Sequence, residues 1–197
     1  MNIHNNIDLQ SIDKNILNPM PGRILISEPF NGQSYFEKAV IYLAEYSKAG
    51  AVGFILNKPM LYTENLFDDD RSFCWNLWLG GPVASDGIFF IHTVGSDLIP
   101  GSFEISEGIF LGGDLNHVIN LLKTKRINES QIRFFVGYSG WSPEKLEKEI
   151  AEKFWIVSKL SSQIIMDTHV DIWSHAVNSL GGKYKLWSQL PPDPSLN

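Results

Sequence analysis

Two apolar segments joined by a short, glycine-containing link constrain the fold more than any other feature of the sequence. Residues 39–46 and 51–57 are separated by Lys48-Ala49-Gly50. A short joint that contains glycine is typical of a β-hairpin. The first segment begins AVIYLAE and is apolar on both faces, as a strand is when both faces of its sheet are covered. The sequence therefore predicts a hairpin that holds a central strand.

The remaining pattern mixes strands and helices. Further strands are expected at residues 23–27, 77–83, 88–93, 103–106, 108–111, 132–138 and 155–157. Helices are expected at residues 115–125, 143–154 and 170–180. Asp114 has the chemistry of an N-cap for the first helix. Because strands and helices do not alternate strictly, the pattern favours an α+β fold, or a mixed α/β sheet, over a doubly wound one.

Length and composition suit one globular domain. Of the 197 residues, 44% are hydrophobic and 19% are charged, which is ordinary for a chain that buries a full core. The break Pro19-Met20-Pro21-Gly22 separates a polar N-terminal arm, residues 1–20, from the domain. We expect the globular domain over residues 21–190 and a C-terminal tail over residues 191–197.

Charge and cysteine content argue against several classes of function. The formal net charge of −6 disfavours broad binding to nucleic-acid phosphates, which needs clustered Lys and Arg. The run Lys123-Thr124-Lys125-Arg126 lies where cations complement a helix C-terminus, although a nucleic-acid patch is the alternative interpretation. Cys74 is the single cysteine, which excludes an internal disulfide and a multi-cysteine metal site. With no secretion signal and no long apolar stretch, we expect a cytoplasmic protein without a membrane partner.

The stretch GYSGWSP, residues 137–143, raises the question of a serine nucleophile. A nucleophile elbow has the pattern Gly-x-Ser-x-Gly, and here Trp141 stands where the second glycine belongs. Ser142 as N-cap and Pro143 as the first helical residue explain the stretch without catalysis. On this interpretation Gly140 and Trp141 lie at a helix N-terminus, where exposed N–H groups suit a small anion.

Several motifs, taken in order, resemble one bacterial family. They are GRILISEP, FEKAVIYLAEY, GAVGFILNKP, LGGPV and VGYSGWSPEKLEKEI, followed by FWIV. In this order they look like the AlgH/YqgE family, and the likeness runs from about Gly22 to Asn197. The resemblance implies one α+β domain whose curled mixed sheet is partly closed into a pseudo-barrel and flanked by helices. It implies no established biochemical activity, although some members carry the label of transcriptional regulator.

The chain also departs from the pattern of that family. Relatives often have alanine where this chain has Ser139, which weakens the nucleophile hypothesis. They tend to be more apolar at Ser27-Glu28-Pro29, and the acidic run Asp68-Asp69-Asp70 resembles an insertion. These departures lie where the rim of a site would be expected.

The glycine turns at strand ends give the preferred site, a pocket for a small ligand or a peptide segment. The candidate ligand-binding residues are Asn57, Gly80, Gly81, Tyr138, Ser139, Gly140 and Trp141. One alternative is a regulatory protein that acts through protein contacts. Another is a hydrolase that uses Ser139 or a His/Asp pair from Asp167, His169, Asp171 and His175. We expect no cofactor and no metal, since convergent ligands are not evident, and the partner is an unidentified small ligand or protein.

Overall fold

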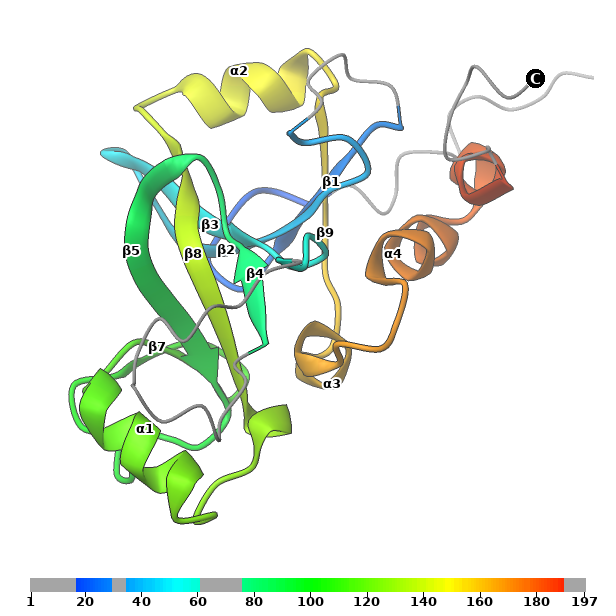
Figure 1. Ribbon diagram of the computed structural model, residues 1–197. Coiled ribbons are helices and arrows are strands. Elements are labelled where there is room, and N and C mark those ends of the chain that lie inside the picture. The colour runs from blue at the N-terminus through cyan, green and yellow to red at the C-terminus, as the bar shows by residue number, and fades with distance from the viewer. Residues whose placement is uncertain (1–16, 30–34, 61–75, 190–197) are drawn as a thin grey trace, which may run out of the picture.

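Nine strands form one sheet in the computed structural model, which describes residues 17–29, 35–60 and 76–189 (Figure 1). The strands are β1 (Ile24–Ser27), β2 (Val40–Ser47), β3 (Gly50–Ile55), β4 (Leu77–Leu79), β5 (Val83–His92), β6 (Phe103–Ser106), β7 (Ile109–Leu111), β8 (Ile132–Trp141) and β9 (Trp155–Ser158). Along the sheet their order is β6-β7-β5-β8-β3-β2-β1-β9. β4 lies off this path and pairs with β8 in parallel, whereas the other pairs are antiparallel.

Strand β8 organises the sheet. One of its edges pairs with β5 from Ile132 to Tyr138. Its other edge pairs first with β4, over residues 134–136, and then with β3, over residues 139–141. The long strand thus joins the β5–β6–β7 part of the sheet to the β1–β2–β3–β9 part.

Helices flank the sheet. They are α1 (Leu115–Lys123), α2 (Lys145–Ala151), α3 (Ser162–Met166) and α4 (Ile172–Leu180), with 3-10 turns η2 (Glu129–Gln131) and η3 (Gly182–Gln189). In Figure 1, α2 lies at one end of the strands, α1 at the other, and α3 and α4 together along one side. No helix in these described stretches is long and apolar enough to cross a membrane.

The core is divided between the two faces of the sheet. On β1 and β2, Ile24 and Tyr42 belong to a cluster that includes residues of α4, whereas Leu25 and Ile41 belong to a cluster that includes Leu146 of α2. A third cluster packs around α1. Because successive side chains of a strand point to opposite faces, the doubly apolar pattern of residues 39–46 is explained by cover on both sides.

The predicted fold class is confirmed: the chain is an α+β domain with a mixed sheet flanked by helices. The hairpin is also confirmed, with β2 and β3 paired from Ile41↔Ile55 to Ser47↔Gly50. Asp114 caps α1, since its carboxylate accepts a hydrogen bond from the His117 N–H at 3.0 Å. The sheet is open rather than partly closed, because β6 and β9 stand at opposite ends of the strand order.

The predicted start of the second helix is wrong. β8 continues through GYSGW to Trp141, where backbone pairing with β3 holds it extended. The Ser142 carbonyl then accepts the Lys145 N–H at 3.1 Å, and Glu144 is left-handed with φ of 64°. A left-handed residue does not continue a right-handed helix, so α2 begins at Lys145 rather than at Pro143. Ser142 is therefore a turn residue and not the N-cap.

Candidate functional site

The two glycines that follow β4 pack against β8 too closely for a side chain. A Cβ atom on Gly81 would lie 2.1 to 2.2 Å from the backbone of Tyr138 and Ser139. A Cβ atom on Gly80 would lie 2.2 Å from the Gly137 carbonyl oxygen. The structure thus brings Gly80, Gly81 and Ser139 together, and glycine is needed for this close approach of two backbones.

Ser139 is buried at this contact. Its side chain is 1% exposed, and its hydroxyl donates a hydrogen bond to the Gly80 carbonyl at 3.1 Å. A nucleophilic serine needs its oxygen open to substrate and its proton directed to a base. The geometry of Ser139 therefore gives the serine form of the hydrolase hypothesis no support.

Trp141 and Gly140 do not lie at a helix N-terminus. Both belong to β8 and pair with β3. The Trp141 indole N–H donates to the Glu149 carboxylate of α2 at 2.7 Å, and the Trp155 indole N–H donates to the same oxygen at 2.8 Å. These hydrogen bonds attach α2 to the sheet through Trp141, and the helix N-terminus that was expected to bind an anion at Gly140 and Trp141 is not there, because α2 begins at Lys145.

Asn57 and Tyr138 complete the set predicted from the sequence. The Asn57 side chain accepts the Val40 N–H at 2.9 Å and donates to the Lys38 carbonyl at 2.7 Å. The Tyr138 ring meets Phe89 edge to face. Asn57 lines the smaller of the two cavities described below, whereas the other six residues line neither. Ligand binding by these seven residues stays a prediction.

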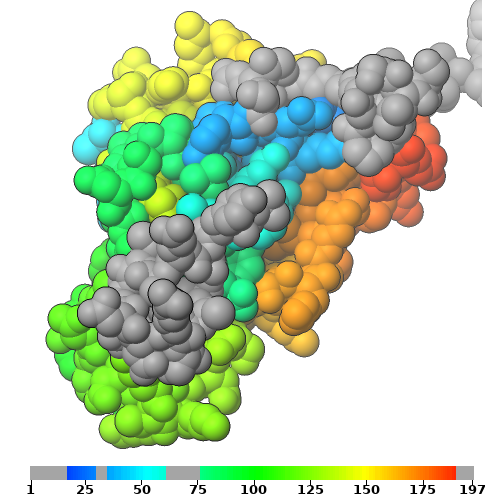
Figure 2. All heavy atoms as spheres, in the orientation of Figure 1, coloured from blue at the N-terminus to red at the C-terminus, as the bar shows by residue number. Residues whose placement is uncertain are grey.

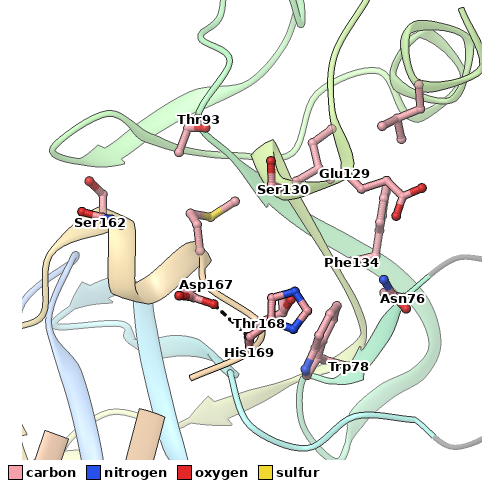
Figure 3. Close-up of a pocket in the computed structure, with 14 residues that line it drawn as sticks. Asn76, Trp78, Thr93, Glu129, Ser130, Phe134, Ser162, Asp167, Thr168 and His169 are labelled. Atoms are coloured by element: carbon pink, nitrogen blue, oxygen red, sulfur yellow. Dashed lines mark hydrogen bonds between the residues drawn. The ribbon is translucent and has the colours of Figure 1, made fainter. Parts of the chain in front are cut away.

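The larger cavity, which we call the outer cavity, has a volume of about 600 Å³ (Figure 3). Its walls come from β4, β8, η2 and α3 with the segment that follows α3. The wall residues are Asn76, Trp78, Thr93, Leu122, Glu129, Ser130, Ile132, Phe134, Ser162, Gln163, Met166, Asp167, Thr168 and His169. Figure 3 shows the side chains of residues 167–169 on one side of it, with Ser130 and Glu129 on the other.

Local structure presents residues 167–169 to this cavity. Ser161 caps the short helix α3 by accepting the Ile164 N–H at 3.4 Å, and the buried Met166 anchors the other end of the helix in the core. The Asp167 carboxylate then accepts the His169 N–H at 2.8 Å. This local turn leaves Asp167, Thr168 and His169 exposed at the cavity wall.

The charges on the outer cavity select against anions. Among the residues that the structure describes, its wall carries two carboxylates, Glu129 and Asp167, and no Lys or Arg. Trp78 and Phe134 supply aromatic surface. Such a wall suits a neutral or cationic molecule that presents hydrogen-bond donors. Within the described stretches of the chain, no group of three or more His, Cys, Asp or Glu residues is placed to hold a metal ion.

A smaller space of about 260 Å³, which we call the inner chamber, shares Trp78, Asp167 and Thr168 with the outer cavity. Its walls are Leu56, Asn57, Pro59, Trp78, Arg133, Asp167, Thr168, Val170, Asp171 and Ile172. The α3–α4 segment closes it on one side, and Figure 2 shows that segment, in orange, against the cyan and green surface of the sheet.

Arg133 is the unusual residue of the inner chamber. It is 2% exposed, and its guanidinium lies over the Trp78 ring, 4.6 Å from the centroid. Nη1 donates to the Ile165 carbonyl at 2.6 Å, and Nη2 donates to the Leu56 carbonyl. The Nε atom has no acceptor among the described residues. Burial lowers the pKa of Arg133 to about 10, against the opposing effect of Asp167, so the buried cation is poorly solvated.

The family follows from comparison with known proteins. A model of the AlgH-like family matches residues 24–185. The chain belongs to the AlgH-like family. A UPF0301 protein of Cytophaga hutchinsonii is 38% identical over 178 residues, which are 89% of this chain and 98% of the relative. A UPF0301 protein of Bacteroides thetaiotaomicron is 36% identical over 193 residues, 96% of this chain and 97% of the relative.

Two solved structures share the fold. The chain superposes on a protein of Corynebacterium diphtheriae with a TM-score of 0.71 at 21% identity, covering 88% of this chain and 93% of that one. For the AlgH protein of Pseudomonas aeruginosa, a UPF0301 protein, the TM-score is 0.68 at 21% identity, with 89% and 98% covered. These matches confirm the AlgH-like resemblance. The AlgH-like family is uncharacterised in function, so the site must be argued from its own geometry.

Sequence reasoning identified little of these two cavities. It named Asp167, His169 and Asp171 as members of a possible His/Asp pair of a hydrolase, and it named Asn57 as a candidate ligand-binding residue. It missed Arg133, although a single charge inside the apolar run IRFFV is a signal that a buried cation needs partners.

Proposed function

We propose that this AlgH-like protein binds a small organic molecule in the outer cavity. The observation that carries the proposal is the cavity itself, whose volume of about 600 Å³ falls within the range of roughly 300 to 1,000 Å³ for ligand sites. Trp78 and Phe134 supply aromatic surface to the same cavity as the polar groups of residues 167–169. Apolar walls with a few convergent polar groups are the usual composition of such sites.

The wall charges narrow the class of ligand. Glu129 and Asp167 accept hydrogen bonds and repel anions, so the part of the ligand in the outer cavity is neutral or cationic and carries donor groups. Trp78 and Phe134 both line the cavity, so an aromatic or other apolar part of the ligand suits this wall. Nucleotides and sugar phosphates are disfavoured, because the described wall residues include no Lys or Arg that would neutralise their phosphates.

A thermal-shift screen with a blocking variant tests the proposal. Ser130 is exposed and lines only the outer cavity, so Ser130→Trp fills that space from its edge. Ser96→Trp, at an exposed position away from both cavities, is the matched control. A ligand at 100 times its Kd stabilises the protein by about 2.7 kcal/mol, which moves the Tm by several degrees for a domain of this size.

We expect neutral or amine-bearing aromatic compounds to raise the Tm of the native protein and of Ser96→Trp, but not of Ser130→Trp. The proposal fails if no compound in a broad metabolite library shifts the Tm. It also fails if Ser130→Trp responds as the control does.

The other two functions remain predictions. Capture of protein partners tests a regulatory role through protein contacts, and cell fractionation tests a cytoplasmic location. For the hydrolase, the Asp167 carboxylate contacts the backbone N–H of His169 rather than its ring, so this pair does not form an acid–base dyad as it stands. A small-molecule binding protein is the function that the geometry supports best.

A further inference from the structure

Arg133 carries a buried positive charge without a carboxylate in contact among the described residues. Two of its five N–H groups have carbonyl acceptors there, and Nε has none. Among the residues that the structure describes, no Asp or Glu oxygen comes within 4.0 Å of the guanidinium. A buried cation is normally paired, because the loss of its hydration is otherwise uncompensated.

The carboxylates near the inner chamber do not supply the missing partner. Asp167 accepts a hydrogen bond from the His169 N–H, and Asp171 caps α4 by accepting the Ser174 N–H. Both aspartates are exposed, so water screens their charges, whereas Arg133 is almost completely desolvated. Among the described wall residues of the chamber, Arg133 carries the positive charge that an anionic group would meet, although Asp167 is near enough to oppose the lowering of the Arg133 pKa.

Other donors lie on the same walls. Asn57 donates one amide hydrogen to the Lys38 carbonyl, and the described residues supply no acceptor for the other; Thr168 contributes an exposed hydroxyl. The chamber of about 260 Å³ is too small for a drug-sized molecule but has room for a carboxylate group. It adjoins the outer cavity through three shared wall residues.

We infer that the inner chamber binds the carboxylate of a small organic acid, with Arg133 as its counter-ion and Thr168 and Asn57 as further donors. The inference deepens the proposed function and rests on it for the identity of the whole ligand. That ligand has a carboxylate at its inner end and a neutral or cationic apolar body, rich in donors, in the outer cavity. An aromatic amino-carboxylic acid is the simplest molecule of this kind.

Sodium acetate is the probe, and the side-chain Nε–H signals of the ¹⁵N-labelled full chain are the readout. The chain has four arginines, so these signals are few, and Arg133→Lys assigns the one of interest. We expect acetate, but not sodium chloride at equal ionic strength, to move the Arg133 signal in a saturable way. A fragment of four heavy atoms binds with a Kd on the order of millimolar. The exposed Arg126 serves as the internal control and should show no saturable change.

Two variants separate a binding role from a structural one. Arg133→Lys keeps a charge but loses the planar donor set, and Thr168→Val removes a hydroxyl at an exposed position that bears no part of the core. We expect each of the two variants to weaken acetate binding at least threefold. Because Arg133→Lys lacks the Arg133 Nε–H signal, its acetate binding is measured on the backbone amide signal of Thr168. If Arg133→Lys does not fold, Thr168→Val alone decides the matter.

Failure of this inference and failure of the proposed function give different results. The inference is overturned if the Arg133 signal responds equally to acetate and chloride. It is also overturned if Thr168→Val binds acetate as tightly as the native chain does. Either result can occur while aromatic compounds still bind the outer cavity, and the proposed function would then stand. In Ser130→Trp the outer cavity is blocked, yet we expect the acetate response of Arg133 to persist. A response lost in Ser130→Trp would show that the probe binds elsewhere, and would also overturn the inference.

Discussion

His92 shows how one buried side chain couples stability to pH. It is fully buried on β5, its Nδ1 accepts the Val94 N–H at 3.3 Å, and its Nε2 lies 3.2 Å from the Gly112 carbonyl. This arrangement holds the ring neutral with the proton on Nε2. Burial lowers the pKa of His92 below its ordinary value of 6.5, although the Gly112 carbonyl opposes the shift. Between the lower pKa of the folded state and pH 6.5, His92 of the unfolded chain therefore binds a proton that His92 of the folded chain does not bind.

The stability due to neutral His92 is complete above pH 6.5 and is lost as the pH falls from there toward the lower pKa of the folded state. We expect the free energy of unfolding to drop by up to about 1.4 kcal/mol per pH unit in this window. Urea titrations at pH 7.5, 6.5, 5.5 and 5.0 measure the slope. His92→Gln keeps a donor for Gly112 and cannot titrate, so its slope should be shallower, and equal slopes would contradict this account.

Sequence reasoning at the residue scale predicted chemistry better than it predicted roles. Gly81 and Ser139 were chosen as ligand contacts, which stays a prediction, and the structure shows that their backbones lie against each other. The close approach of two backbones joins residues nearly 60 positions apart, so no local pattern contains it. Asp114 was predicted correctly because an N-cap depends only on the next few residues.

At the scale of elements, the clearest feature is the pair of hydrogen bonds that attaches α2 to the sheet. Glu149 accepts both indole N–H groups of Trp141 and Trp155, which are 6% and 4% exposed. Glu149→Ala leaves two nearly buried donors without an acceptor, and each costs about 1 to 3 kcal/mol. We expect a loss of about 3 kcal/mol in the free energy of unfolding, measured by urea titration.

Glu152→Ala is the matched control, because that carboxylate is at the C-cap of the same helix and, among the described residues, makes an exposed pair with Lys148 at 3.9 Å and no other ion pair. We expect it to change stability by no more than about 0.5 kcal/mol. Glu149→Gln retains an acceptor oxygen and should fall between the two. A loss for Glu149→Ala no larger than that for Glu152→Ala would show that the indoles find other acceptors.

Strands and helices could be predicted from the sequence where the local residue pattern and the tertiary contacts favour the same structure. The apolar runs that became β2, β3 and β8 have lengths typical of strands, and most of their residues are buried in the structure. The signal Ser142-Pro143-Glu144 favoured a helix start, but pairing of β8 with β3 carried the strand to Trp141. The helix α3 was missed because five residues are too few to show a helical period.

At the scale of the whole molecule, the cavities depend on segments that are distant in sequence. Residues 76–78, 129–134 and 162–169 form the outer cavity, and Arg133 joins β8 to the carbonyls of Leu56 and Ile165. Each segment has an ordinary pattern when it is considered alone. Their meeting is fixed by the strand order, in which β8 lies between β5 and β3. A site of this kind is therefore visible only once the topology is known.

The same topology predicts that the domain unfolds as one unit. β2 contributes Tyr42 to one core cluster and Ile41 to another, and β8 contributes Phe135 and Phe134 to the first cluster and the third. Because neighbouring residues of single strands belong to different clusters, loss of one cluster removes support from the others. We expect far-UV circular dichroism and tryptophan fluorescence to report the same urea midpoint and the same slope. Trp78, Trp141 and Trp173 lie in different parts of the fold, so an independent β5–β6–β7 unit would appear as two separate transitions and would contradict the prediction.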